Sequence, residues 1–225
     1  MEELEKKLNY VFKDKALLRT ALNHSSYANE HRAWGIVSNE RLEFLGDSVL
    51  GQVVATHLYL NCPDMPEGQM TRLRAELVCE QSLFEVAKVL ELGKYICLGK
   101  GEEHSGGRNR ESILADAVEA VIAALYLDGG MDEAKAFIDR VILSDKDKLR
   151  SRVASDWKTA IQELVQHNPG SKLTYELESE SGPDHNKTFT VSVRLDGRVL
   201  GTGSGRTKKE AEQNAAKSGL RELSE

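Results

Sequence analysis

The sequence predicts two domains of different class: an all-α domain over residues 1–147, a linker over 148–154, and a small α+β domain over 155–225. Along the first domain, apolar residues recur at the spacing of amphipathic helices. Residues 144–155 are rich in charge and poor in large apolar side chains, which is typical of a domain boundary. Beyond them the pattern changes to the order α-β-β-β-α.

The first domain is expected to hold several helices joined by loops. Helices are predicted over residues 13–27, 39–60, 67–78, 81–90, 112–127 and 131–143, with loops over 28–38 and 98–111. Pro63 and Pro66 end the second helix. The run His24-Ser25-Ser26 has no partner acid or oxyanion motif placed by the sequence, so packing and helix capping are its expected roles.

The second domain alternates apolar and polar residues in three short segments. Strands are predicted over residues 173–178, 189–195 and 198–205, between helices that begin near Trp157 and Lys208. Asp196-Gly197 is a two-residue hairpin turn. Thr207 and Glu210 have the spacing of a capping box, which opens the last helix.

Composition limits the class of protein without choosing a function. Of the 225 residues, 40% are hydrophobic and 29% charged, as in ordinary soluble domains. The start lacks the apolar core of a signal peptide, and the most apolar run, residues 117–127, is too short to span a bilayer. Three cysteines without metal-ligand spacing suggest free thiols. We therefore expect a cytoplasmic protein with no membrane partner. The net charge of −6 does not exclude nucleic acid, because phosphates need local basic clusters rather than a basic total.

The predicted helix over residues 39–60 carries three acids near its start. Glu40, Glu43 and Asp47 are spaced i, i+3 and i+7, so their carboxylates share one face. Asn39 is the expected N-cap, with its side-chain oxygen accepting a backbone N–H. Gly46 costs roughly 1 kcal/mol of helix propensity, which suggests that a neighbouring backbone approaches closely there.

A solvated acidic face is the simplest interpretation of these three carboxylates. Their place among apolar residues instead puts them at the edge of a core, where crowded carboxylates need a cation or a raised pKa. Oxygen ligands without histidine or cysteine favour a hard cation, Mg²⁺ or Mn²⁺, over zinc.

The helix over residues 112–127 is apolar almost all round and must be central to its domain. Asp116 and Glu119, spaced i and i+3, are its only charges. Burying two carboxylates costs several kcal/mol each unless they are paired or bind a metal. Because this helix has no lysine or arginine, the pattern favours metal ligation.

The run from Asn39 to Gly51 resembles the signature helix of the ribonuclease III family, endonucleases that cut double-stranded RNA, and Asp116-Ala-Val-Glu-Ala is similar to that family's second motif. The resemblance extends through residues 67–78 and makes Glu67 a further acid of the cluster. On sequence alone, Glu67 is a first-turn acid that the helix dipole favours. No acid of the motifs is replaced by a neutral residue.

The second domain resembles the double-stranded RNA-binding domain. The residues that carry this resemblance, and which it makes candidate RNA contacts, are Gln162, Glu163, His185, Lys208 and Lys209. A helix N-terminus with two lysines suits phosphates, and the first helix and the histidine loop could reach 2′-hydroxyls in the minor groove. Taken singly, the lysines could be a solvated cap and His185 a loop histidine.

The family resemblance implies a Mg²⁺-dependent endonuclease, with Mn²⁺ as a substitute and no organic cofactor. Glu43, Asp47, Asp116 and Glu119 would hold the metal, which would activate water and stabilise the leaving oxygen. Glu40 and Glu67 would shape the edge of the site. The family forms homodimers and leaves 5′-phosphate and 3′-hydroxyl ends, and its substrates include precursors of rRNA and mRNA.

Two points stay open at this stage. Residues 98–111 could be a flexible surface loop or, by the resemblance, lie near substrate with Arg108 and Arg110 on phosphates. The alternatives to an enzyme are a non-catalytic double-stranded RNA-binding protein, and an interaction protein whose acidic cluster is structural. The intact Asp116 and Glu119 argue against the first alternative.

Overall fold

The computed structural model describes residues 1–63, 65–144, 157–166, 171–183 and 187–224, without the side chains of residues 159, 163, 166 and 224. The chain divides into two compact units, Met1–Lys146 and Asp147–Glu225, which are described one at a time. The predicted linker over residues 148–154 lies outside the described residues. Among the described residues, no helix is both long and apolar enough to cross a membrane.

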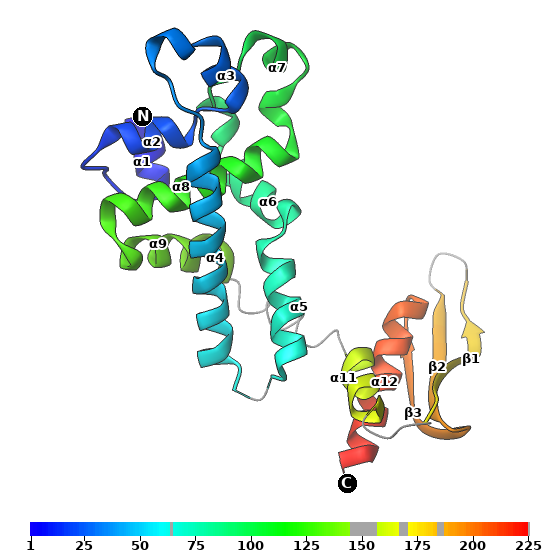
Figure 1. The fold of residues 1–225 in the computed structure, drawn as a ribbon. Helices are drawn as coiled ribbons and strands as arrows, with labels where there is room; N and C mark the ends of the chain where they lie inside the picture. The colour runs from blue at the N-terminus through cyan, green and yellow to red at the C-terminus, as the bar shows by residue number, and fades with distance from the viewer. Residues whose placement is uncertain (64, 145–156, 167–170, 184–186, 225) are drawn as a thin grey trace. The chain divides into compact units, whose positions relative to one another are not determined.

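The first unit is helical, as its apolar spacing predicts (Figure 1). Its α-helices are α1 (Glu2–Leu8), α2 (Lys15–Ala21), α3 (Ser25–Glu30), α4 (Glu40–Asn61), α5 (Glu67–Val78), α6 (Glu80–Leu90), α7 (Lys100–His104), α8 (Glu111–Gly129) and α9 (Met131–Ile138). Short 3₁₀ turns are η1 (Arg32–Trp34), η2 (Leu92–Lys94) and η3 (Gly107–Asn109). A π-helical turn, η4 (Asp139–Leu143), continues α9.

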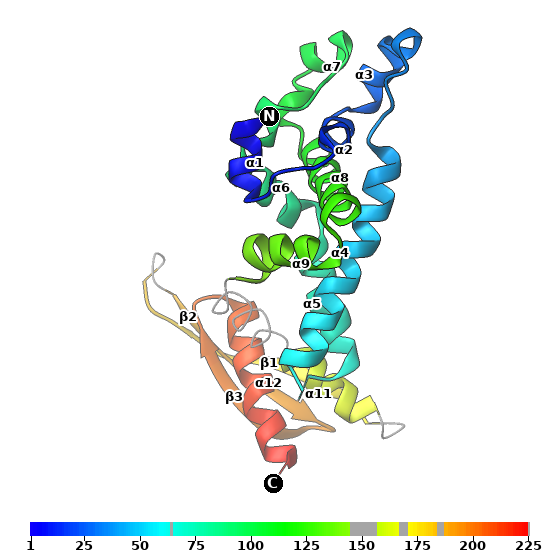
Figure 2. The same ribbon diagram turned by 90° about the vertical axis from the view of Figure 1, so that its left-hand side faces the viewer.

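Helix α8 forms the centre of this unit, with the long helix α4 packed across it (Figures 1 and 2). Eleven of the nineteen residues of α8 are buried, which accounts for its nearly continuous apolar sequence. The central position predicted for this helix is confirmed. Asp116 and Glu119 are therefore held on the central helix of the unit.

The helix predicted over residues 13–27 is wrong as a single element, because the chain breaks between α2 and α3. The backbone N–H of Cys97 donates to the carbonyl of Leu22, and the N–H of His24 donates to the carbonyl of Cys97. The N–H of Asn39 donates to the carbonyl of Asn23. These bonds use backbone groups that a continuous helix needs for itself, and they fix the start of α4.

Both loops predicted in this unit hold more regular structure than expected. Residues 28–38 contain the end of α3 and the turn η1, and residues 98–111 contain α7 and η3. Helices α3 and α7 lie side by side and are joined by hydrogen bonds (Figure 1). Residues 98–111 are therefore not an irregular loop.

The second unit has the predicted order α-β-β-β-α. Helix α11 (Trp157–Gln166) precedes the antiparallel strands β1 (Leu173–Ser181), β2 (Thr188–Leu195) and β3 (Arg198–Gly205), and α12 (Lys208–Ser224) follows. The hairpin residues Asp196 and Gly197 have φ of 50° and 87°, as a two-residue turn requires. Both helices pack on one face of the sheet, around Ile161, Val193 and Ala215.

Candidate functional site

The acidic residues of the first unit meet where α4 crosses α8. At this crossing there is no room for a side chain on Gly46, because a Cβ atom there would lie 1.8 Å from the carbonyl oxygen of Glu119. The close approach predicted from Gly46 is confirmed. Since Glu43 and Asp47 flank Gly46 on α4, the crossing brings their carboxylates toward those of α8.

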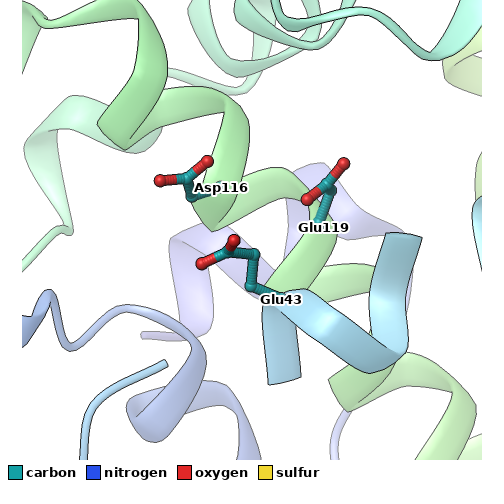
Figure 3. A group of neighbouring side chains, drawn as sticks. All are labelled: Glu43, Asp116 and Glu119. Atoms are coloured by element: carbon teal, nitrogen blue, oxygen red, sulfur yellow. The ribbon is translucent and has the colours of Figure 1, made fainter. Parts of the chain in front are cut away.

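Three of the predicted ligands form a tight group (Figure 3). Carboxylate oxygens of Glu43, Asp116 and Glu119 lie within 4.8 Å of one another, and all three residues are half-buried. Glu43 comes from α4, and Asp116 and Glu119 come from successive turns of α8. Three oxygen donors converging at this distance match the ligand preference of a hard divalent cation.

The electrostatics of the group also call for a cation. Burial, and then the charges of Asp47, Asp116 and Glu43, raise the pKa of Glu119 to about 8. Burial and neighbouring carboxylates likewise raise the pKa of Glu43 and of Asp116. No lysine or arginine of the described chain forms an ion pair with these three groups. The residues therefore fit a divalent cation, which would relieve their mutual repulsion.

Asp47 and Glu40 lie at the exposed edge of the group. Both side chains are exposed on α4. The charge of Asp47 raises the pKa of Glu119, and that of Glu40 raises the pKa of Glu43, so both act on the group without being buried in it. Glu40 accepts a hydrogen bond of 2.7 Å from the hydroxyl of Ser38, which orients its carboxylate.

Within a single chain the structure does not bring Glu67 to this group, so its membership of the acidic cluster stays a prediction. Glu67 begins α5, opposite the C-terminal half of α4, and accepts a hydrogen bond of 2.8 Å from Thr71. It lines a separate hollow of about 420 Å³ with Tyr59, Leu60 and Met70. On one chain Glu67 is the first-turn acid that its position predicts.

Two residues near Asp116 were missed by the sequence interpretation. The charge of Glu80, the first residue of α6, raises the pKa of Asp116, and His24 acts in the opposite direction. His24 is also the N-cap of α3, with Nδ1 2.8 Å from the hydroxyl of Ser26, so its predicted capping role is confirmed. Both residues come close to Asp116 only through tertiary packing, which cannot be predicted from the local spacing of residues in the sequence.

Asn39 precedes α4 as predicted, but its side chain does not cap the helix. Its side-chain amide donates to the carbonyl of Ala21 at 3.3 Å, and no side-chain capping bond forms. The residue is 5% exposed, so the amide serves to join α2 to the start of α4.

The guanidinium groups proposed for phosphate contacts are used within their own segment. Arg108 donates to the carbonyls of Gly93 at 2.6 Å and Ile96 at 3.0 Å, and it pairs with Glu103. Arg110 pairs with Glu102 at 2.6 Å. These contacts hold residues 98–111 against η2, and a phosphate on Arg108 would have to displace Glu103.

The second unit presents a basic helix start. Lys208 and Lys209 are exposed in the first turn of α12. Thr207 caps α12 as predicted, because the N–H of Glu210 donates to its hydroxyl at 3.1 Å. The return bond of the predicted capping box is shifted by one residue, since Glu210 accepts at 2.8 Å from the N–H of Arg206 rather than from that of Thr207. Of the other predicted contacts, Gln162 is exposed on α11, whereas His185 and the side chain of Glu163 lie outside the described residues.

Strand β3 fixes the position of α12 through glycine. A Cβ on Gly203 would lie 2.1 Å from the backbone nitrogen of Ala215, and one on Gly201 would lie 2.4 Å from that of Gly219. Strand and helix backbones are therefore in contact, and this contact sets the position of α12 on the sheet.

Comparison with known proteins gives matches over nearly the whole chain. Residues 14–146 match the family described as Ribonuclease-III-like, and residues 157–223 match the Double-stranded RNA binding motif. Ribonuclease 3 of Listeria monocytogenes serotype 4b is 49% identical over 99% of this chain and 97% of its own length. Ribonuclease 3 of Caldanaerobacter subterraneus subsp. tengcongensis is 52% identical, over 98% of this chain and 96% of its own length.

A solved structure agrees with these matches. The nuclease domain of ribonuclease III from Campylobacter jejuni superposes with a TM-score of 0.60 at 42% identity, covering 65% of this chain and 98% of that one. A helical nuclease unit followed by a double-stranded RNA-binding unit defines an endoribonuclease of double-stranded RNA. The chain belongs to the ribonuclease III family. Membership implies a divalent metal ion.

Proposed function

We propose that this enzyme hydrolyses phosphodiester bonds of double-stranded RNA with Mg²⁺ held by Glu43, Asp47, Asp116 and Glu119. The convergence of three half-buried carboxylates without a basic partner carries the proposal. Mn²⁺, which accepts the same oxygen ligands, substitutes for Mg²⁺. No organic cofactor takes part.

The cation, when bound, supplies an activated water and charge stabilisation at the leaving 3′ oxygen. The protein residues divide the remaining work by position. Glu119 must give up its proton to become a ligand, because its pKa near 8 favours the neutral form without a cation. The exposed carboxylates of Asp47 and Glu40 face the side from which water and RNA approach, and Glu40 orients water there. The products carry 5′-phosphate and 3′-hydroxyl ends.

Binding of the duplex rests on the second unit. Lys208 and Lys209 contact phosphates across the major groove, where the free N–H groups of the α12 start add to their charge. Gln162 and Glu163 on α11, together with His185, reach 2′-hydroxyls in the minor groove. Arg108 contributes through the fold of residues 98–111, and it reaches a phosphate only by releasing Glu103.

The enzyme works as a homodimer. Its Campylobacter relative is described as having a region involved in dimer formation. On this chain, α4 leaves Phe44 near its start and Tyr59 and Leu60 near its end between 69% and 76% exposed, apolar side chains that a second copy would cover. Glu67 lines the hollow beside Tyr59, so we place its contribution to cleavage at the dimer interface.

The cytoplasm is the proposed site of action, where the free thiols of Cys62, Cys79 and Cys97 stay reduced. The proposed substrates are precursors of rRNA and structured mRNA. A non-catalytic RNA-binding role is the alternative, and it predicts binding without cleavage.

The test is to incubate the purified protein with a perfect RNA duplex in Mg²⁺ and in EDTA, and to size the products. We expect cleavage of both strands in Mg²⁺, none in EDTA, and 5′-phosphate ends on the fragments. Binding without cleavage in either Mg²⁺ or Mn²⁺ would overturn the assignment of the acidic group and leave the RNA-binding role.

A further inference from the structure

Residues 25–38 form a segment that is rooted beside the acidic group at both ends. The segment begins directly after His24, whose charge acts on Asp116. It ends at Ser38, whose hydroxyl bonds to Glu40. RNA lying across the acidic group would therefore pass close to this segment.

The segment is held in place by bonds to α7. The hydroxyl of Ser26 accepts from the N–H of Gly99 at 2.9 Å, and Glu30 accepts from the N–H of Lys100 at 2.8 Å. Both donors are backbone N–H groups. These two bonds tie the segment to the start of α7.

Three aromatic rings follow one another along this segment. Tyr27 and His31 have ring centroids 4.1 Å apart, and His31 and Trp34 have centroids 5.0 Å apart. Nδ1 of His31 donates to the carbonyl of Tyr27 at 2.8 Å, which fixes the middle ring. Trp34 ends the series and is 76% exposed, so His31 supports one side of the indole while much of the ring faces solvent.

A single exposed apolar residue is ordinary and carries no meaning by itself. Trp34 differs because its ring contacts a second ring, belongs to a segment whose two ends lie beside the acidic group, and shares the turn η1 with the exposed Arg32. Aromatic rings with nearby arginine are the usual surface on which RNA bases stack. Bases within a duplex are already stacked, so the ring can accept only an unpaired base.

We propose that Trp34 stacks on an unpaired base of the RNA beside the bond that is cut. This inference rests on the proposed function of the acidic group. It makes Trp34 a specificity-determining residue, through which the enzyme prefers duplexes interrupted by an unpaired nucleotide at one fixed distance from the cleaved bond.

The kinetic test compares a perfect duplex with duplexes that carry one unpaired nucleotide at successive positions. At one position we expect the wild-type KM to be about 5- to 150-fold lower than for the perfect duplex, which corresponds to stacking of one base. Trp34→Ala should lose this advantage while cutting the perfect duplex at the wild-type rate. Val89→Ala, which alters a side chain 80% exposed on α6, is the matched control and should keep it.

Fluorescence gives a readout that is independent of cleavage. Trp34 and Trp157 are the two tryptophans, so Trp157→Phe leaves Trp34 as the only one. In that protein, with Glu119→Gln added to prevent cutting, the favoured interrupted duplex should quench the emission more than the perfect duplex.

Three results would overturn the proposal while leaving the proposed function intact. The first is equal cleavage of all duplexes by wild type and Trp34→Ala. The second is equal quenching by perfect and interrupted duplexes. The third is dissociation of Trp34→Ala into monomers, which would make the ring a contact between copies of the chain.

Discussion

In both units of the chain, a glycine allows two backbones to come into contact, but the charges beside the two contacts have opposite signs. In the first, Gly46 lets α4 touch the backbone of α8 at Glu119. In the second, Gly203 lets β3 touch the backbone of α12 at Ala215. The first contact crowds carboxylates, whereas the second sets a helix N-terminus that bears Lys208 and Lys209.

This difference teaches that close backbone approach is a means of placing charge. At the α4–α8 crossing, the backbone contact concentrates negative charge in a half-buried place, which favours binding of a cation. At the β3–α12 contact, the basic helix start is exposed, which favours binding of a phosphate. If each backbone contact positions only the charges beside it, a substitution at the α4–α8 contact should spare RNA binding. A substitution at the β3–α12 contact should likewise spare cleavage.

The largest expected effect comes from removing one charge at the crossing. Glu119→Gln should lower the cleavage rate about 100-fold or more, because losing several kcal/mol of charge stabilisation slows a reaction by that much. Affinity for duplex RNA should remain. Glu111→Gln, at the exposed start of the same helix, is the control and should cut normally in the same gel assay. Normal cleavage by Glu119→Gln would remove Glu119 from the site.

The next largest effect is expected from a substitution that disturbs the α4–α8 contact but leaves all the carboxylates in place. Gly46→Ala introduces a Cβ that would lie 1.8 Å from a backbone oxygen, so the helices must separate. We expect a loss of about 3 kcal/mol in the free energy of unfolding, and weak cleavage even where the protein stays folded. Urea denaturation measures the first and the gel assay the second.

Gly51 is the matched control for Gly46, because it lies on the same helix and a Cβ there meets nothing within 4 Å. Gly51→Ala should leave cleavage unchanged and stabilise the helix by up to about 1 kcal/mol. Similar behaviour of the two alanine variants would contradict the close approach.

The corresponding change in the second unit is Gly203→Ala. Here the added Cβ would lie 2.1 Å from the nitrogen of Ala215, so α12 must move off the sheet. We expect duplex affinity to fall roughly tenfold, while cleavage at saturating RNA stays near normal, as in a loss of about 1.4 kcal/mol of binding. Thr202→Ala, at an exposed position of the same strand, should bind RNA as wild type does in a filter assay.

A smaller effect is expected from the lysines themselves. Replacing Lys208 or Lys209 with alanine should weaken binding uniformly across RNA sequences and reduce the slope of log affinity against log salt by about 1. The value of KM should rise while kcat holds. Lys172→Ala, at an exposed position before β1, is the control for a general effect of charge. If it reduces the salt slope equally, the start of α12 is not a specific phosphate-binding site.

The smallest effect concerns pH. The pKa of Glu119 is raised from 4.5 to about 8, so without a divalent cation its contribution to stability is complete below about pH 4.5 and is lost as pH rises toward 8. Thermal melts in EDTA should show this decline in the wild type and a weaker one in Glu119→Gln. Mg²⁺ should offset it at high pH, since only the ionised carboxylate binds the cation. Identical declines in both proteins would contradict the raised pKa.

Much of the site could be predicted because its information is local. The positions of Glu43 on one helix and of Asp116 and Glu119 on another can be read from the sequence. Gly46, within a predicted helix, indicated that a neighbouring backbone packs against it. The α-β-β-β-α order was equally local, being set by alternation and by the turn at Asp196-Gly197.

The features that could not be predicted depend on partners far along the chain. The break after α2 occurs because Leu22 and His24 bond to Cys97. The nearness of His24 and Glu80 to Asp116 has the same origin. Arg108 is used inside its own segment, and Glu67 lies away from the acidic group, because of packing that helical spacing does not encode.

The most direct test of the central claim is to measure the number and the affinity of cations bound at the α4–α8 crossing. Mn²⁺ titrations followed by electron paramagnetic resonance would compare wild type, Glu119→Gln and Glu111→Gln without RNA. We predict that wild type and Glu111→Gln bind Mn²⁺ equally, and that Glu119→Gln binds it at least about tenfold more weakly. Equal affinity in all three proteins would mean that the crowded carboxylates are not the metal site.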